Sequence, residues 1–417
     1  MDPRISLHAT PKAWLFNSVL APYADAFAAY LRRGRYSSGS KRRQLGAVAH
    51  LARWMTQNCL PVRLLDESAV ERFLVGHVPR CDCPRPVIRT RNELRAACAH
   101  LLDILREEHV IAERPRETGH IADELYRYDD YMQHVQGLIE GTRSGRLRFV
   151  QRLLLHKFAD GPVMIAELQP DDVRQFIAQQ LDLRSTTSNA TAVTSALRAY
   201  FRYRTTCGDR MHGVVGVIAK PARWSLGSLP RGLSNAETSR LLSSFVDSLP
   251  APRRGYAMVR CALDMGLRSS EVAKLQLADI DWRNGTVTLR RTKSRREDIL
   301  PLPALAGRAL ADYLRYERPK TTNPAVFVRR LAPRDQPIGV DAVRRVIGDA
   351  FRRIGLTHGR THALRHTVAS RLLDRGGSLK EVADVLRHRS LNTSLIYAKL
   401  DQPRLATVAL PWPGSAT

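Results

Sequence analysis

The stretch THALRHTVAS, residues 361–370, brings three chemically active side chains within five positions: His362, Arg365 and His366. An arginine fork suits phosphate or carboxylate oxygens, and an imidazole can accept or donate a proton near neutral pH. Two histidines four apart could instead hold zinc. However, this stretch has no glutamate where a zinc hydrolase places its base, and the neighbouring arginine disfavours a cation. Two interpretations stay open, a helix end packed on solvent and half of a phosphate-binding catalytic centre, and the rest of the chain decides between them.

A second candidate, Arg268, stands between two expected helices. The first helix is expected to end at Gly266, and Ser269 or Ser270 is expected to cap the next one. An arginine at a helix start meets the positive end of the helix dipole, which points weakly to an anion nearby. Glu271 is placed to pair with an arginine or to cap the helix.

Lys293 lies in the turn of a hairpin that we expect over residues 285–303, GTVTLRRTKSRREDILPLP. β-Branched alternation, a charged turn and a second short alternating run are typical of a hairpin. Such a basic tip could approach a DNA groove or backbone. By itself the pattern favours a solvated turn that discourages edge pairing.

Two further candidates follow residues 361–370. Ser378 and Glu381 form a capping box for a helix that is expected to end at His388. Tyr397 lies in the next expected helix, LNTSLIYAKL. A tyrosine in an amphipathic helix normally packs in the core with its hydroxyl at the edge, so Tyr397 alone predicts no chemistry.

Taken together, these candidates form an ordered set over residues 230–400 that resembles the tyrosine recombinase (phage integrase) family. The resemblance rests on MGLRSSEV, the lysine hairpin, HALRHTVASRLL, VLRHRSLNTSLIYAKL and the spacing among them. Each motif is weak alone, whereas the ordered set is specific. The resemblance implies a catalytic set of Arg268, Lys293, His362, Arg365, His388 and Tyr397.

The resemblance also implies a role for each of these residues. Tyr397 would attack a DNA phosphodiester and form a covalent 3′-phosphotyrosine link. Arg268 and Arg365 would hold the phosphate oxygens as negative charge develops. Lys293 would protonate the departing 5′ oxygen. These steps need no cofactor and no metal ion.

Two histidines complete the implied set. His362 would assist proton transfer from the tyrosine, and His388 would bind the phosphate or help the same transfer. Glu271 would orient its neighbours, and His366 is interpreted as packing or as a partner behind the reacting groups.

The elements that must position these residues belong to a strongly basic chain. The net charge of its 417 residues is +26, and a folded surface this positive is most easily explained by DNA or RNA. A GC-rich genome would explain arginine in place of lysine, but not the excess of base over acid. No apolar run is long enough to span a membrane, and the first residues lack the pattern of a secretory signal. The six cysteines show no regular spacing that would indicate disulfides, which favours reduced thiols in a cytoplasmic protein.

The chain divides into expected helical domains followed by a catalytic part, a fold class that is mainly α with a small β-sheet. Apolar residues recur at three and four through the first half, and RETGHIADEL is interpreted as a connector. The expected domains are 1–118 (N-terminal, helical and arm-like), 123–220 (core-binding and helical), 221–233 (linker), 234–400 (mixed α/β catalytic domain) and 401–417 (tail, docked on a neighbouring subunit or on its own domain).

A constant offset of 103 residues relates the two helical domains, which indicates a duplicated fold. Chance alignment of short amphipathic helices is the alternative. The matched pairs are Leu51 and Leu154, Leu65 and Leu168, Val70 and Val173, Phe73 and Phe176, and the run Leu94, Arg95, Ala96 with Leu197, Arg198, Ala199.

The expected function is site-specific integration, excision or transposition of a mobile element. The partners would be double-stranded DNA and three more copies in a homo-tetramer, with sister recombinases where the element encodes them. A type IB topoisomerase and a non-cutting DNA-binding protein of the same fold are the alternatives. The complete catalytic set argues against the second, since a protein that does not cut needs no such set.

A separate group of side chains, His77, Cys81 and Cys83, lies in GHVPRCDCPRP, with Cys98 and His100 further on. This group could form a small zinc site. C-x-C spacing is less typical of zinc than C-x-x-C, so ordinary thiols and imidazoles are the favoured interpretation.

Overall fold

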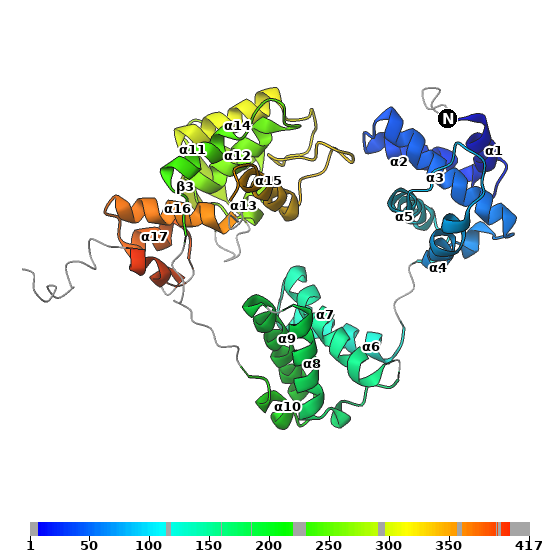
Figure 1. The fold of residues 1–417 in the computed structure, drawn as a ribbon, viewed down its shortest axis with the longest axis horizontal. Helices are drawn as coiled ribbons and strands as arrows, with labels where there is room; N and C mark the ends of the chain where they lie inside the picture. The colour runs from blue at the N-terminus through cyan, green and yellow to red at the C-terminus, as the bar shows by residue number, and fades with distance from the viewer. Residues whose placement is uncertain are drawn as a thin grey trace, which may run out of the picture. The chain divides into compact units, whose positions relative to one another are not determined.

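The computed structural model describes most of the chain. The described residues are 7–113, 118–159, 161–184, 186–219, 231–290, 297–356, 361–388, 390 and 393–400, with residues 399 and 400 described by their backbone alone. Most of them are helical, and the three strands among them form one sheet (Figure 1). The expected class, mainly α with a small β-sheet, is therefore confirmed. No helix in these ranges is long and apolar enough to cross a membrane.

Residues 7–113 form a helical part with its own hydrophobic core, built from residues that recur at helical spacing. Its two long helices, α3 and α5, pack on each other. The elements are α1 (Ala9–Phe16), η1 (Ala21–Tyr23), α2 (Ala24–Arg33), α3 (Ser38–Gln57), η2 (Val62–Leu64), α4 (Glu67–Glu71), the π-helical η3 (Arg72–His77), η4 (Val78–Arg80) and α5 (Arg91–Glu107).

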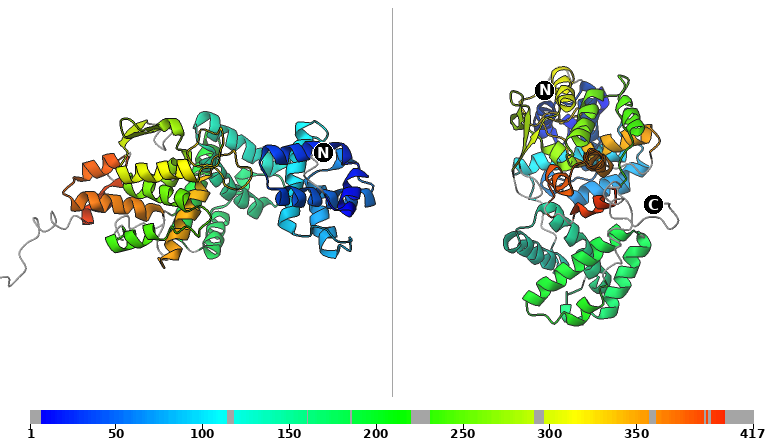
Figure 2. Two further views of the ribbon diagram at one scale, coloured as in Figure 1. Left: turned by 90° about the horizontal axis from the view of Figure 1, so that it is seen from above. Right: turned by 90° about the vertical axis from the view of Figure 1, so that its left-hand side faces the viewer.

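Residues 118–219 form a second helical bundle around a separate core, seen in cyan to green in Figure 2. Its first helix begins at His120, inside the expected connector RETGHIADEL, because Ile121, Leu125 and Tyr128 pack into this core. The elements are α6 (His120–Asp130), the π-helical η5 (Tyr131–Val135), α7 (Glu140–Phe158), η6 (Ile165–Glu167), α8 (Pro170–Leu183), α9 (Thr187–Thr206) and α10 (His212–Gly216).

The two helical parts correspond at several positions. η2 and η6 begin 103 residues apart, and so do α4 and α8. α3 packs on α5 as α7 packs on α9. The apolar pairs matched in the sequence are buried in both parts: Leu51 and Leu154, Leu65 and Leu168, Val70 and Val173, Phe73 and Phe176, and Leu94 and Leu197.

The described residues from 231 to 400 hold the only sheet among the described elements. Strand β2 pairs antiparallel with both β1 and β3, and Leu289 lies opposite Asp298, which confirms the expected hairpin. The elements are α11 (Asn235–Ser243), α12 (Pro252–Asp264), α13 (Ser269–Lys274), η7 (Leu277–Asp279), β1 (Ile280–Asp281), β2 (Thr286–Leu289), β3 (Asp298–Pro301), α14 (Ala304–Tyr316), α15 (Val340–Arg353), α16 (Thr361–Asp374), α17 (Leu379–Val385) and η9 (Leu395–Leu400).

The core of this part is centred on α12, which packs against α14, α15 and α16. A smaller core forms where α16, α17 and η9 meet, and Tyr397 belongs to it. The predicted capping box of Ser378 with Glu381 is present, and Ser234 with Glu237 forms another at the start of α11. The smaller core joins α16 and α17 to the segment that carries Tyr397, and α12 packs on the same helix α16.

Candidate active site

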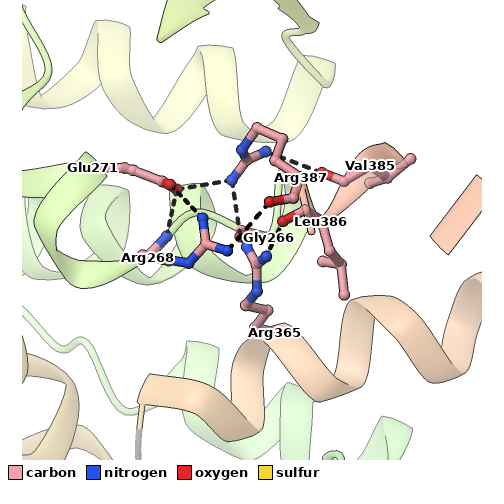
Figure 3. Close-up of polar contacts among 7 residues, drawn as sticks. All are labelled: Gly266, Arg268, Glu271, Arg365, Val385, Leu386 and Arg387. Atoms are coloured by element: carbon pink, nitrogen blue, oxygen red, sulfur yellow. Dashed lines mark hydrogen bonds and ion pairs between the residues drawn. The ribbon is translucent and has the colours of Figure 1, made fainter. Parts of the chain in front are cut away.

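Arg365 extends from α16 toward two main-chain carbonyls on other segments. Its Nη1 donates to the carbonyl oxygen of Gly266 and its Nη2 to that of Leu386 (Figure 3). The side chain is only 5% exposed. Burial, followed by the nearby charges of Arg268 and Arg387, lowers the pKa of Arg365 to about 9, so the group stays cationic at neutral pH.

Gly266 shapes the turn between α12 and Arg268. Its φ is +61°, a left-handed conformation that glycine adopts without a steric penalty. A Cβ at this position would lie 2.8 Å from Cδ2 of Leu386. The carbonyl of Gly266 also accepts a hydrogen bond from Nη2 of Arg387 at 3.3 Å. Because Gly266 has no side chain, this turn can lie close to Leu386. Its carbonyl oxygen is then within hydrogen-bond distance of both Arg365 and Arg387.

Arg268 is held by Glu271, one turn further along α13. Its Nη1 donates to Oε1 of Glu271 at 2.7 Å, and its main-chain nitrogen donates to Oε2 at 2.8 Å. The residue that precedes α13 is Arg268 itself, so the expected caps Ser269 and Ser270 are wrong. The Glu271 carboxylate already satisfies the main-chain donor of Arg268, and both serines lie within the helix.

Glu271 also binds a third arginine that the sequence interpretation missed, Arg387. Nη2 of Arg387 lies 2.7 Å from Oε2 of Glu271, and both side chains are buried (Figure 3). Burial alone would raise the pKa of Glu271, but Arg387 and the hydrogen bonds from Arg268 outweigh burial and lower it. One ionised carboxylate thus fixes two guanidinium groups beside Arg365.

The hydroxyl of Tyr397 lies 2.8 Å from Nδ1 of His366. Tyr397 is 2% exposed, and burial raises the pKa of its phenol although the charge of Arg365 opposes this effect. Burial and the nearby His362 and Arg365 lower the pKa of His366. A neutral imidazole therefore faces a protonated phenol, an arrangement in which the hydroxyl can donate to the ring nitrogen.

His388 also lies beside the ring of Tyr397. The two rings are nearly parallel, with an interplanar angle of 4° and centroids 6.4 Å apart. Its Nδ1 lies 2.6 Å from the hydroxyl oxygen of Ser394. Burial and the charges of Arg365 and Arg268 lower the pKa of His388 to about 4, so the ring is neutral at pH 7.

His362 and Arg365 stand three positions apart on α16 but differ in burial. Arg365 is buried with Leu364 and Val368, whereas His362 is exposed in the first turn of the helix. Arg365 is buried because it bridges to the carbonyls of Gly266 and Leu386. Lys293, the remaining predicted residue, lies outside the described residues, although its hairpin strands are described.

The structure therefore brings four predicted residues into one site: Arg268, Arg365, His388 and Tyr397. To these it adds His366, which touches the tyrosine hydroxyl directly, and Arg387 and Ser394, which sequence reasoning did not single out. A buried phenol beside neutral imidazoles and fixed guanidinium groups suits nucleophilic attack on a phosphate.

Comparison with known proteins identifies the family of the chain. A family model described as "Phage integrase family" matches residues 232–404. The integrase/recombinase y4rA of Sinorhizobium fredii is 35% identical over 404 residues, covering 95% of both chains. Tyrosine recombinase XerC of Azotobacter vinelandii is 30% identical over 287 residues, covering 68% of this chain and 94% of its own.

A solved structure shares the fold. The XerH site-specific recombinase, solved with a palindromic difH substrate in a post-cleavage complex, matches with a TM-score of 0.53 at 18% identity. The match covers 82% of this chain and 95% of XerH. The chain belongs to the phage integrase family of tyrosine recombinases, and it is an enzyme of site-specific recombination.

Proposed function

We propose that this recombinase cleaves and rejoins DNA strands through a 3′-phosphotyrosine intermediate on Tyr397, in the service of a mobile element. The observation that carries the proposal is the position of the Tyr397 hydroxyl, buried and 2.8 Å from His366, in the same site as the cationic Arg365. A core tyrosine needs only a hydrogen-bond partner for its hydroxyl, whereas here the partner is a titratable imidazole and a buried guanidinium group lies in the same site.

The proposed reaction conserves the phosphodiester energy. The Tyr397 oxygen bonds to the scissile phosphorus, and the bond from phosphorus to the 5′ oxygen breaks. The phenolic proton leaves through the histidines, and the 5′ oxygen takes a proton from Lys293. Attack by a 5′ hydroxyl of a second strand reverses these changes, so the reaction needs no nucleotide cofactor.

Arg268 and Arg365 stabilise the pentacoordinate phosphate in this proposal. Each guanidinium carries five N–H donors in a fixed plane, and the protein contacts of each group use only some of them. Because Glu271 and the two carbonyls already fix these groups, little reorganisation is needed as charge develops on the phosphate. Preorganised donors of this kind contribute about 100- to 1,000-fold to rate.

His366 is the residue best placed to receive the tyrosine proton, since its Nδ1 contacts the hydroxyl. His362 lies in the preceding turn and lowers the His366 pKa, so it tunes this group or passes the proton on. His388 is neutral and hydrogen-bonded to Ser394, and we assign it a hydrogen bond to the phosphate.

DNA is the proposed substrate, and the helical parts are proposed to grip it. Residues 123–220 take the core-binding role. The correspondence of η2 with η6 and of α4 with α8 supports a second DNA-binding module of the same fold in residues 1–118. The XerH and Tn1549 integrase structures are complexes with DNA. A homo-tetramer on two DNA sites, acting in the cytoplasm, completes the proposal.

A nicked suicide substrate tests the proposal. DNA from the ends of the element that carries this gene is nicked beside the cleavage point, so that the released fragment diffuses away and the covalent adduct accumulates. The adduct should join the protein to a 3′ phosphate. Pairs of labelled sites then distinguish strand exchange from relaxation of a supercoiled plasmid without exchange, which would indicate topoisomerase activity.

A further inference from the structure

Four metal-binding side chains converge in residues 7–113, a part of the chain that holds none of the residues assigned to catalysis. One ligand atom from each lies within 4.8 Å of every other: His50, His77, Cys81 and Cys83. His50 is fully buried and Cys83 is 2% exposed. The sequence interpretation considered three of these residues with Cys98 and His100, and favoured ordinary thiols and imidazoles. It missed His50, the residue that completes a set of four.

Three separate segments bring the ligands together. His50 lies in the middle of α3, His77 ends the π-helical turn η3, and Cys81 and Cys83 lie in the irregular segment that leads to α5. Phe73 packs against both imidazoles, edge-on to His50 and stacked on His77. The aromatic ring thus restricts how the two imidazoles turn.

The distances between the ligand atoms fit one tetrahedral ion. Zinc bonds of about 2.0–2.1 Å to nitrogen and 2.3 Å to sulfur place two nitrogens about 3.3 Å apart and a nitrogen and a sulfur about 3.5 Å apart. Nε2 of His50 lies 3.1 Å from Nε2 of His77 and 3.3 Å from Sγ of Cys81. Sγ of Cys83 lies 3.7 Å from Nε2 of His77.

The hydrogen bonding of His50 presents a lone pair to this centre. Its Nδ1 lies 2.8 Å from the carbonyl oxygen of Ile88, which can only accept, so Nδ1 carries the proton and Nε2 does not. A second partner that fixes the tautomer is the usual arrangement around a zinc-bound histidine. The alternative is a hydrogen bond from Nε2 of His77 to Nε2 of His50 with no metal present. Such a bond would explain the distance between the two nitrogens, but not why two thiols lie beside them.

We propose that His50, His77, Cys81 and Cys83 bind one structural Zn²⁺ ion. Two thiolates and two neutral imidazoles around Zn²⁺ carry no net charge, which suits a buried position. Four protein ligands close the coordination sphere, so the ion holds structure and takes no part in chemistry. It fastens the segment after η4 to α3 and η3. His100 takes no part, since its Nδ1 lies 3.0 Å from the hydroxyl of Tyr30, and Cys98 is not a member of the group.

Metal content of the untagged full-length protein is the first test. Protein produced in zinc-supplemented medium and purified without chelators should contain about one zinc per chain by mass spectrometry. Replacing zinc by Co²⁺ should give the intense visible absorption of a tetrahedral ion and a thiolate-to-cobalt charge-transfer band. A zinc content near zero together with an octahedral cobalt spectrum would overturn the proposal, and iron in place of zinc would change the metal assigned.

Cysteine variants locate the site. Cys81→Ser and Cys83→Ser should lose the zinc, whereas the matched controls Cys59→Ser and Cys207→Ser, both at exposed positions, should keep it. Equal zinc in all four variants would overturn the ligand assignment. If Cys83→Ser fails to fold, the test is made on the wild-type protein. A strong chelator should lower the temperature at which residues 7–113 unfold, and added zinc should restore that temperature. No chelator effect on a zinc-loaded protein would contradict a structural role.

Discussion

Nδ1 of His366 lies 2.8 Å from the hydroxyl oxygen of Tyr397, whereas His362, the histidine first assigned to proton transfer, lies exposed in the preceding turn. This contact joins α16 to η9 and sets the direction of the phenol. Because the pKa of His366 is lowered and that of Tyr397 is raised, the proton rests on the tyrosine at neutral pH. In the proposed mechanism, these two residues hold the nucleophile in protonated form beside its base.

Replacing His366 separates proton transfer from positioning. His366→Gln keeps an acceptor near the hydroxyl but cannot take up a proton at neutral pH. We expect cleavage of a suicide substrate to slow about 100-fold or more in this variant and in His366→Ala, with DNA binding unchanged. Near-normal cleavage by His366→Gln and loss only in His366→Ala would show that the residue positions the tyrosine and accepts no proton.

The lowered pKa of His388 predicts weaker folding in acid. The folded pKa is about 4 and the unfolded one is near 6.5, so the unfolded chain binds more protons between these values. Stability contributed by the neutral ring is complete above pH 6.5 and is lost as pH falls toward 4, by about 1–2 kcal/mol for a half-buried ring. Thermal unfolding at pH 7.5 and pH 5 measures the loss, which should be smaller in His388→Asn; equal losses would contradict the prediction.

Removing Glu271 leaves the buried Arg387 without its carboxylate. We expect Glu271→Ala to lower the free energy of unfolding by about 3–5 kcal/mol, since an unpaired buried charge is costly. The matched control is Asp341→Ala, which breaks the exposed pair of Asp341 with Arg344 and should cost less than about 1 kcal/mol. Denaturant unfolding compares the two variants, and similar small losses would mean that Arg387 finds another partner.

Gly266 can be compared with Gly285, because both have a φ near +60°. Alanine at either position should cost about 1–2 kcal/mol of left-handed strain. A Cβ at Gly285 meets no atom within 4 Å, whereas one at Gly266 approaches Leu386 and displaces the carbonyl that binds Arg365 and Arg387. Gly266→Ala should therefore also reduce strand cleavage while Gly285→Ala does not. Equal activity in the two would contradict a role for this carbonyl.

Local signals predicted much of the catalytic part correctly. The hairpin around Lys293 and the capping box at Ser378 depend on residues a few positions apart, so the sequence contains the whole pattern. Where a local pattern was compatible with two structures, tertiary contacts determined which of them formed. RETGHIADEL became the start of α6 because its apolar residues found a core, and Arg268 took the cap position because Glu271 binds its main-chain nitrogen.

Partners that lie far apart in the chain could not be predicted. Arg387 pairs with Glu271 across 116 residues, and nothing in the LRHR run distinguishes it from a surface arginine. In the sequence, His50 is not distinguishable from the other positions of an amphipathic helix. Only folding brings its Nε2 close to His77 and Cys81. A single useful signal was present: His366 directly follows Arg365, so it had to lie near any site that Arg365 serves.

Covalent capture of DNA by Tyr397 tests the proposed mechanism most directly. Wild type and Tyr397→Phe are incubated with a nicked substrate labelled on each side of the cleavage point, and the products are separated under denaturing conditions. Wild type should carry the label that ends in a 3′ phosphate, and Tyr397→Phe, which binds DNA but has no nucleophilic oxygen, should carry none. An adduct of undiminished yield in Tyr397→Phe would contradict the assignment of Tyr397 as the nucleophile.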